Sequence, residues 1–383
     1  MAVLLWIIYS LFLKDEPPPV RLSINIAGGV YVDKQSKASP VRHKDYSKPT
    51  DHAPSSSCSA MQFIVYSCGL KCDSVVEQEI GIVTAYLVAV LTNRTFVIAR
   101  NSICNIGEFF QPNDYNWTEC EDYVSNIPTN DSDIFSMSYT QTHRNRTKAQ
   151  NDNLSNYFLS LLHKKVIILD INWNTFSIIK HSLVPGCTPK LRWIAFADGP
   201  DIFYHSYHAI FKPVPHLTDS LEYIFKNEIG KRHLICGLAE RAYSYGRKHN
   251  KKERMAGLTA VSFIEYHYTN SSKYVTFVVS DVHGVGEQAV SKLPNHLDMF
   301  KALDNIRRFG QQNVPLPDSC KMLHTRILEQ MILTRCELLA FRKSAGSQLV
   351  LALRDHPGGL FMFNDTEKRI MSVDKWNVAD FVM

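Results

Sequence analysis

The sequence has little excess charge of either sign and no apolar run as long as a bilayer is thick. Its 383 residues carry a formal net charge of +5, which falls short of the basic excess of nucleic-acid-binding domains. The mild positive balance favours anionic substrates. We therefore expect no nucleic-acid partner, whereas nucleotide, sugar and peptide ligands all stay open.

Sequence signatures of two ligand classes, dinucleotides and zinc, are also missing. No Gly-x-Gly-x-x-Gly follows an expected strand near the start of either half of the chain, which disfavours a nicotinamide-dependent oxidoreductase. Cys68 and Cys72 lack the second pair or His partner that a zinc site needs. His205 and His208, which we place in a loop, are too small a set by themselves. We therefore expect neither pair to hold a metal ion.

The N-terminal segment, residues 1–13, is apolar but short. The run at 2–13 has 12 residues, against the roughly 20 that span a bilayer. Charged residues and prolines follow it instead of a small-residue cleavage site. A cleaved signal peptide and a membrane anchor that begins further upstream both stay open. Residues 14–57, rich in Pro, Ser, Lys and Asp, fit a flexible stem.

Glycosylation sequons and cysteines indicate the secretory pathway. Asn-x-Ser/Thr occurs in polar surroundings at Asn116, Asn130, Asn145, Asn153, Asn270 and Asn364. Nine cysteines could form several disulfides in an oxidising lumen. Cys236 and Cys336 lie in apolar strand-like runs, so we expect them to be buried thiols. The expected location is the Golgi membrane, with the folded part in the lumen.

Apolar runs of strand length alternate with helical patterns in two parts of the chain. In the first part we expect helices at 74–91 and 154–162, and strands at 61–66, 95–99, 166–171 and 191–196. The stretch 101–164 is otherwise expected to be irregular. In the second part we expect strands at 234–238, 274–280, 338–341 and 360–363, and helices at 217–227, 256–268, 284–293, 323–333 and 346–353. This alternation predicts an α/β protein with two Rossmann-like, doubly wound domains, at 58–210 and 211–375.

The stretch Glu337–Arg354 has the layout of a phosphate-binding turn. A short apolar run ends in small residues and hydroxyls, where the unpaired N–H groups and the dipole of a new helix favour an anion. An ordinary Ser N-cap explains the same residues and stays open. Ligands of open α/β sheets bind beyond the carboxyl ends of the strands. The polar residues expected there, and our candidate site residues, are Arg241, Ser280, Asp281, Lys343, Ser344, Gly346 and Ser347.

Four stretches, in order along residues 62–363, resemble the GDP-fucose-dependent fucosyltransferase superfamily, which includes O-fucosyltransferases and α-1,2- and α-1,6-fucosyltransferases. These stretches are the following: 68–72 with 81–83, which resembles the residues flanking a Gly-rich turn; 86–98 (YLVAVLTNRTFVI), which resembles a helix entering the second strand; 279–281 (VSD); and Cys336-Glu337-Leu338-Leu339 with Ser344 and Ser347. The order of the motifs carries the resemblance more than any one of them.

The resemblance implies a GT-B fold, in which two Rossmann-like domains face a cleft. The C-terminal domain would hold the nucleotide sugar GDP-fucose and the N-terminal one a glycan or glycoprotein acceptor. The implied reaction is an inverting transfer, assisted by an Arg, here Arg241, and by helix-start N–H groups, without a cofactor or obligatory metal. Asp281 would contact guanine or ribose, while Ser344 and Ser347 would contact phosphate.

The chain departs from the family pattern at three of these places. Residues 73–80 (DSVVEQEI) replace the glycines and the Asp-Arg pair of the first turn. Glu240 takes the place of the expected basic residue unless Arg241 is shifted by one, and Ala345-Gly346 displaces a glycine by one. Two interpretations therefore stay open: an active transferase, and a catalytically degenerate member that serves as a lumenal binding module.

Overall fold

The computed structural model describes residues 58–67, 75–99, 106–127, 133–139, 163–171, 199–238, 251–268, 272–280, 282, 284–293, 295–308, 318–354, 358–364 and 366–373. The chain divides into two units, Met1–Arg42 and His43–Met383, and every described residue belongs to the second. The N-terminal apolar segment, the stem and the elements expected at 154–162 and 191–196 lie outside the described residues.

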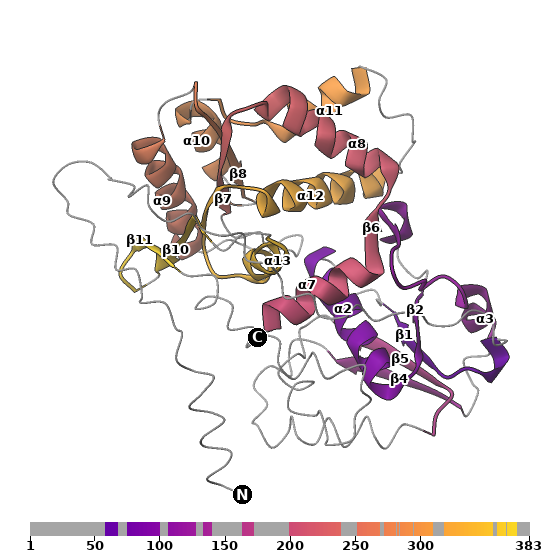
Figure 1. Ribbon diagram of the computed structural model, residues 1–383. Helices are drawn as coiled ribbons and strands as arrows, with labels where there is room; N and C mark the ends of the chain where they lie inside the picture. The colour runs from indigo at the N-terminus through magenta and orange to yellow at the C-terminus, as the bar shows by residue number, and fades with distance from the viewer. Residues whose placement is uncertain are drawn as a thin grey trace, which may run out of the picture. The chain divides into compact units, whose positions relative to one another are not determined.

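A parallel four-stranded sheet, in the order β2-β1-β5-β4, is built from the N-terminal half of the described chain (Figure 1). Its strands are β1 (Phe63–Tyr66), β2 (Thr95–Ile98), β4 (Ile134–Tyr139) and β5 (Val166–Ile171). Helix α2 (Val75–Thr92) forms the expected crossover from β1 to β2. The sequence prediction of β1, α2, β2 and β5 is confirmed, whereas β4 lies in the stretch expected to be irregular.

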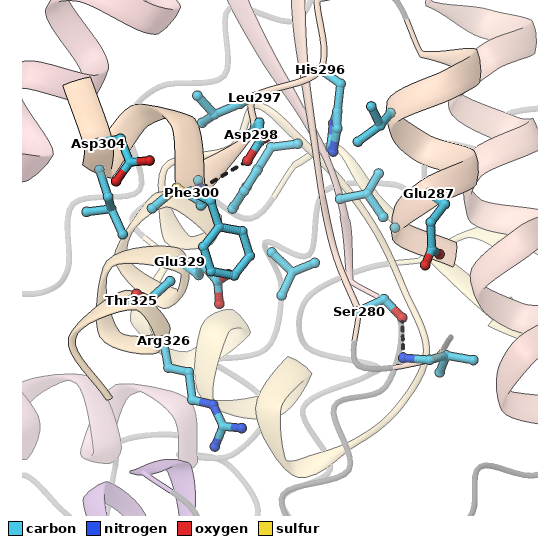
Figure 2. Close-up of a pocket in the computed structure, with 18 of the residues that line it drawn as sticks. Ser280, Glu287, His296, Leu297, Asp298, Phe300, Asp304, Thr325, Arg326 and Glu329 are labelled. Carbon is cyan, nitrogen blue, oxygen red and sulfur yellow. Dashed lines mark hydrogen bonds between the residues drawn. The ribbon is translucent and has the colours of Figure 1, made fainter. Parts of the chain in front are cut away.

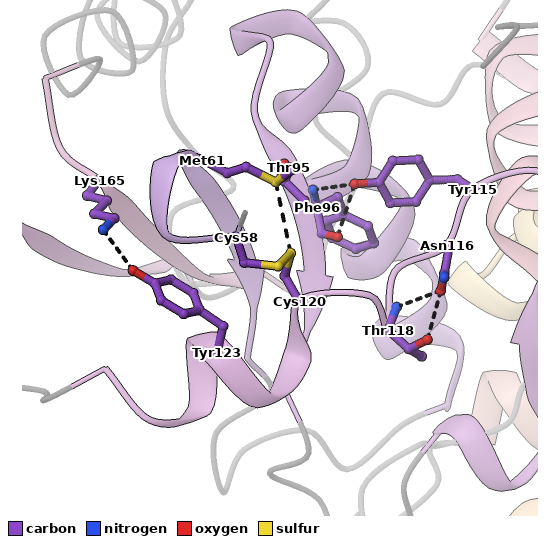
Figure 3. Close-up of a disulfide and its surroundings, with 10 residues drawn as sticks. All are labelled: Cys58, Met61, Thr95, Phe96, Tyr115, Asn116, Thr118, Cys120, Tyr123 and Lys165. Atoms are coloured by element: carbon purple, nitrogen blue, oxygen red, sulfur yellow. Dashed lines mark hydrogen bonds between the residues drawn. A yellow bond between two sulfur atoms is a disulfide. The ribbon is translucent and has the colours of Figure 1, made fainter. Parts of the chain in front are cut away.

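The two faces of this sheet pack into different cores, as the period of two in a strand requires. Ile64 and Tyr66 join the large core that contains α2, whereas Phe63 and Val65 join a smaller one with Cys120. A disulfide from Cys58 in η1 (Cys58–Ala60) to Cys120, just before α3 (Glu121–Ser125), closes the second face (Figure 3). The same figure shows the Tyr115 hydroxyl, which donates to the carbonyl of Phe96 and accepts from its N–H.

A short antiparallel ribbon and four helical segments connect the two halves of the sequence. They are η2 (Ile106–Glu108), β3 (Phe110–Pro112), α7 (Gly199–Ile210), β6 (Phe211–Pro213), which pairs with β3, α8 (Pro215–Tyr223) and the π-helical turn η5 (Ile224–Ile229). His205 and His208 lie on α7, so their assignment to a loop was wrong. Buried residues recur there at helical spacing, at Ile202, Phe203, Ser206, Tyr207 and Ile210.

A five-stranded sheet, in the order β11-β10-β9-β7-β8, is built from the C-terminal half. Its strands are β7 (His233–Leu238), β8 (Tyr274–Val279), β9 (Leu338–Phe341), β10 (Leu360–Asn364) and the antiparallel β11 (Arg369–Ser372). The associated helices are α9 (Lys251–His267), α10 (Val285–Lys292), α11 (Met299–Arg308), α12 (Asp318–Thr334) and α13 (Ala345–Leu353). All of these elements except α11 and β11 correspond to elements expected from the sequence.

The five-stranded sheet is covered on both faces. Ile235, Val278 and Leu338 pack in the core that contains α9 and α10. Leu234, Cys236 and Phe277 alternate with them and pack in the core that contains residues of α11, α12 and α13. The parallel sheets with helices establish the predicted α/β fold class. The domain boundary at residue 210 stays a prediction.

The structure contradicts one cysteine prediction. Cys236 and Cys336 form a disulfide instead of two buried thiols. Pairing of β7 with β9 brings their Cα atoms to 5.9 Å, inside the range that a disulfide bridges. The apolar surroundings that suggested free thiols are real, because both residues are fully buried. Burial therefore says nothing about whether the two sulfur atoms are bonded.

Candidate functional site

Three neighbouring parallel strands of the C-terminal sheet end in one row. Leu238, the last residue of β7, pairs with Val279 on β8 and with Phe341 on β9. Because adjacent strands lie about 4.8 Å apart, the residues that follow β8 and β9 are roughly 10 Å from each other, with the end of β7 between them. Register alone thus brings Ser280 and the turn after β9 to one edge of the sheet.

The candidate residues are only partly accounted for at this edge. Ser280, Lys343, Ser344, Gly346 and Ser347 are described, and all of them follow strands of this row. Arg241 and Asp281 lie outside the described residues. Their contact with a ligand, like that of the other five, stays a prediction.

The turn between β9 and α13 begins the helix with a capping box. Ser344 has an extended backbone, with φ −156° and ψ 168°, and its hydroxyl accepts from the Ser347 N–H at 3.2 Å. In return the Ser347 hydroxyl accepts from the Ser344 N–H at 2.8 Å. This is the Ser N-cap that the sequence left open, and Ser347 is 0% exposed. Lys343, which is exposed, is the cation that this turn presents to solvent.

A pocket of about 1020 Å³ opens beside Ser280 (Figure 2). Its walls come from the end of β8, from α10, from the chain leading into α11, and from α11 and α12; the lining side chains include His296, Asp298, Phe300, Thr325, Arg326 and Glu329. The Ser280 hydroxyl accepts from the Val282 N–H at 3.0 Å and closes a turn at the rim. Sequence reasoning missed most of this lining because it did not predict α11.

Carboxylates outnumber cations around the pocket. Glu287, Asp298, Asp304 and Glu329 face Lys321 and Arg326. Burial lowers the pKa of His296, although a hydrogen bond to the Thr276 carbonyl and the charge of Asp298 oppose the shift. Its Nδ1 lies 3.3 Å from that carbonyl oxygen, which can only accept, so Nδ1 carries the proton of the neutral ring. At neutral pH the lining is therefore net negative.

The residues described here hold no cluster of three or more His, Cys, Asp or Glu side chains placed to bind a metal ion. His205 and His208 instead flank the ring of Tyr204, with ring centroids 5.6 Å and 4.4 Å away. Burial lowers the pKa of His216, and its ring stacks on that of His324 at 5.7 Å.

Glu79 on α2 is a buried carboxyl that sequence reasoning missed. Its side chain is 0% exposed and accepts from the Tyr207 hydroxyl at 3.0 Å and from the Gln330 side-chain amide at 2.8 Å. Burial raises its pKa from 4.5 to about 7, against the opposing effect of the two hydrogen bonds. The signal in the sequence was its spacing, three residues after Val76 and four before Val83, on the apolar face of the helix.

Comparison with solved structures places this architecture in a known class. A mutant of Arabidopsis thaliana FUT1 in complex with GDP matches with a TM-score of 0.50 and 12% identity, over 79% of this chain and 70% of that one. NodZ, an α-1,6-fucosyltransferase soaked with GDP-fucose, matches with a TM-score of 0.51 and 12% identity, over 82% of this chain and 99% of that one. A further structure of fucosyltransferase NodZ, from Bradyrhizobium, gives a TM-score of 0.48 at 13% identity, over 82% and 99%.

The class defined by these matches is the α/β GT-B-like fold. Within that class, the chain has a fucosyltransferase-like fold, as its motifs suggested, and the low identity marks it as divergent. No family model and no curated protein matches the sequence.

Proposed function

We propose that this chain is a glycosyltransferase that transfers fucose from GDP-fucose to a glycan or glycoprotein, with inversion at the anomeric carbon. The observation that supports this most is the fold shared with FUT1, solved with GDP, and with NodZ, soaked with GDP-fucose. Fold is an analogy for function, so the chemistry has to be argued from the residues at the strand ends.

In the proposed reaction, an acceptor hydroxyl attacks the anomeric carbon from the face opposite GDP. The bond from that carbon to the phosphate oxygen breaks, GDP leaves with the electron pair, and the hydroxyl proton is released. The main electrostatic requirement is to stabilise the leaving diphosphate. We assign this to Arg241, to the exposed Lys343 and to the N-terminus of α13, with no metal ion required.

The charge distribution supports this position for the diphosphate. The pocket beside β8 has four carboxylates against two cations, so a diphosphate among them would be repelled. The turn after β9 presents a lysine and a helix N-terminus instead. The nucleoside would then extend toward Ser280, which lies on the pocket rim, and toward Asp281.

We also propose that the protein folds in the lumen of the secretory pathway, in the Golgi. Two disulfides among the described residues, Cys58–Cys120 and Cys236–Cys336, support an oxidising compartment. An anchor at residues 1–13 would hold it at the membrane. In the described part of the chain, no helix is both long and apolar enough to cross a bilayer.

Calorimetry of GDP binding to the full chain tests the proposal. We expect binding at micromolar concentrations, weakened at least tenfold by Arg241→Ala and by Lys343→Ala, because a charge-assisted contact to phosphate contributes about 1.5–3 kcal/mol. A third substitution, Ser344→Ala, removes the N-cap acceptor of α13. GDP binding by this variant is compared with that of Ser344→Asn, a matched control that keeps an N-cap acceptor.

Fucose transfer from GDP-fucose to a glycan array is the second measurement. Transfer that is lost in Arg241→Ala supports the enzyme. The absence of GDP binding at high micromolar concentration contradicts it, and GDP binding without transfer to any acceptor favours the non-catalytic binding module.

A further inference from the structure

The outer edge of β8 is partly covered by the chain itself. β8 is the last strand of its sheet, so one row of its backbone groups faces away from β7. At Thr276 these groups are used: its N–H donates to the Asn295 carbonyl at 3.3 Å and its carbonyl accepts from the Leu297 N–H at 2.8 Å. This short parallel bridge ends where Asp298 turns the chain away, since its carboxylate caps α11.

The next outward-facing groups on β8 belong to Val278. The His233 N–H donates to the Lys273 carbonyl, and the register from there pairs the odd-numbered residues of β8 with β7. Val278, two residues beyond Thr276, therefore directs its N–H and carbonyl outward. Within the described residues, no other backbone group hydrogen-bonds to them. Val278 is itself 8% exposed and lines the pocket of about 1020 Å³, so the pair lies at the wall of this pocket.

This part of the pocket is a slot between the two helical layers. The Val278 side chain packs toward α9 and α10, while Phe277 packs toward the opposite layer. Val290 on α10 is 59% exposed and Phe300 on α11 is 78% exposed, and both line the pocket. Figure 2 shows Phe300 and Ser280 on different walls of it. An added strand would place alternate side chains against these two walls.

We propose that the edge of β8 at Val278 binds an extended polypeptide by strand addition, and that apolar residues alternate with basic ones in that polypeptide. Main-chain hydrogen bonds to Val278 would align the bound peptide along β8, as in other proteins that accept a peptide at a sheet edge. The apolar walls at Val290 and Phe300 select apolar side chains. The excess of carboxylates around the slot selects basic ones. This binding does not depend on the proposed transferase activity.

Fluorescence anisotropy with the full chain and a labelled Lys-Val-Lys-Val-Lys-Val peptide tests the proposal. We expect saturable binding, at least fivefold weaker for the same peptide N-methylated at every residue, which loses its N–H donors. A Glu-Val-Glu-Val-Glu-Val peptide should bind at least tenfold more weakly. Amide hydrogen exchange should slow at Val278 when the Lys-Val peptide binds.

Variants of the chain test whether the peptide binds in the slot or elsewhere on the surface. Val278→Pro removes the outward N–H but no bond to β7, and should weaken the peptide about fivefold. Phe300→Ser should weaken it as well. Tyr266→Ala, an equally exposed aromatic residue on α9, is the control and should leave binding unchanged. Lys343→Ala, which should weaken GDP binding, should leave peptide binding unchanged, which separates this proposal from the transferase.

Three results would overturn the proposal. One is no peptide binding at millimolar concentration. Another is equal affinity for the N-methylated peptide with unchanged exchange at Val278, which stands even if Val278→Pro does not fold. The third is a dimer in sedimentation that Phe300→Ser dissociates, since a second copy of the chain would then occupy the slot.

Discussion

Glu79 contributes to stability in a way that depends on pH. Its carboxyl is fully buried between α2, α7 and α12, where Tyr207 and Gln330 are its hydrogen-bond partners among the described residues. Because burial raises its pKa from 4.5 to about 7, the folded protein holds this proton over a pH range in which the unfolded chain has released it. The contribution of the protonated form is complete below pH 4.5 and is lost as the pH rises through about 7.

Replacement of Glu79 by Gln should remove this loss. The free energy of unfolding of the native chain should fall by about 3 kcal/mol between pH 4.5 and 7, since each unit of pKa corresponds to about 1.4 kcal/mol. The Glu79→Gln variant should not show this fall. Urea unfolding at a series of pH values measures the effect. Glu222→Gln, at an exposed position on α8, is the control. A slope that is the same in Glu79→Gln and in the native chain would show that the pKa of Glu79 does not differ between the folded and unfolded states.

Single residues were the hardest feature to predict from the sequence. The capping serine Ser344 was recognised because a hydroxyl before an apolar helical run is a local pattern. The Cys236–Cys336 disulfide was not, because it depends on which strands are neighbours, 100 positions apart in the sequence. The carboxyl of Glu79 was missed for the same reason, since one of its partners is 251 residues away.

Helix α2 approaches its sheet at Gly81 more closely than any other residue type allows. A Cβ atom there would lie 1.9 Å from the Ile171 carbonyl oxygen and 2.8 Å from the Tyr66 ring. The carbonyl belongs to β5 and cannot rotate away as a side chain could. The glycine thus sets the distance between α2 and the parallel sheet.

Gly81→Ala should therefore destabilise the protein by about 3 kcal/mol or more, because backbone has to move. The same substitution at Gly286 in α10, where a Cβ meets nothing within 4 Å, should stabilise it by roughly 0.5–1 kcal/mol. Thermal unfolding of the two variants measures both changes in stability, which should have opposite signs. Equal effects at the two positions would contradict the close approach at Gly81.

Most elements could be predicted from the sequence because their apolar pattern is local. β7, β8 and β9 are nearly continuous apolar runs, as buried parallel strands are, and they were found within one residue of their ends. Helix α11 does carry a helical pattern, since Met299, Ala302, Leu303 and Ile306 are buried at helical spacing, and the sequence prediction overlooked it. The half-exposed edge strand β11 has no comparable pattern. Strand β4 (IFSMSY) mixes apolar and polar residues, and its place in the sheet follows from its pairing with β5. The missed helix α11 explains why the pocket beside β8 was also missed.

The Cys236–Cys336 disulfide acts on the molecule as a whole. It closes 100 residues of chain, which restricts the unfolded state and should contribute about 2–5 kcal/mol to stability. The double substitution of both cysteines by Ala should lower stability by that amount without adding a buried polar group. Chemical unfolding measures the loss.

The two described disulfides should differ in their rates of reduction. Both Cys236 and Cys336 are fully buried, whereas Cys58 is only half-buried. Mild reductant should therefore open Cys58–Cys120 in the folded protein first, as seen by alkylation and mass spectrometry over time. Simultaneous opening of both bonds would show that the protein unfolds before either is reduced.

The Cys236–Cys336 disulfide also determines what happens when a protease cleaves the backbone once. A protease that cleaves the backbone once between residues 237 and 335 produces two polypeptides, but the bridge from β7 to the residue before Glu337 keeps them in one covalent molecule. On a gel without reductant the cut protein should migrate as a single species of full mass. The two pieces would also keep the paired β7 and β9 at their centre, so a backbone cut in this region need not separate the halves of the C-terminal sheet.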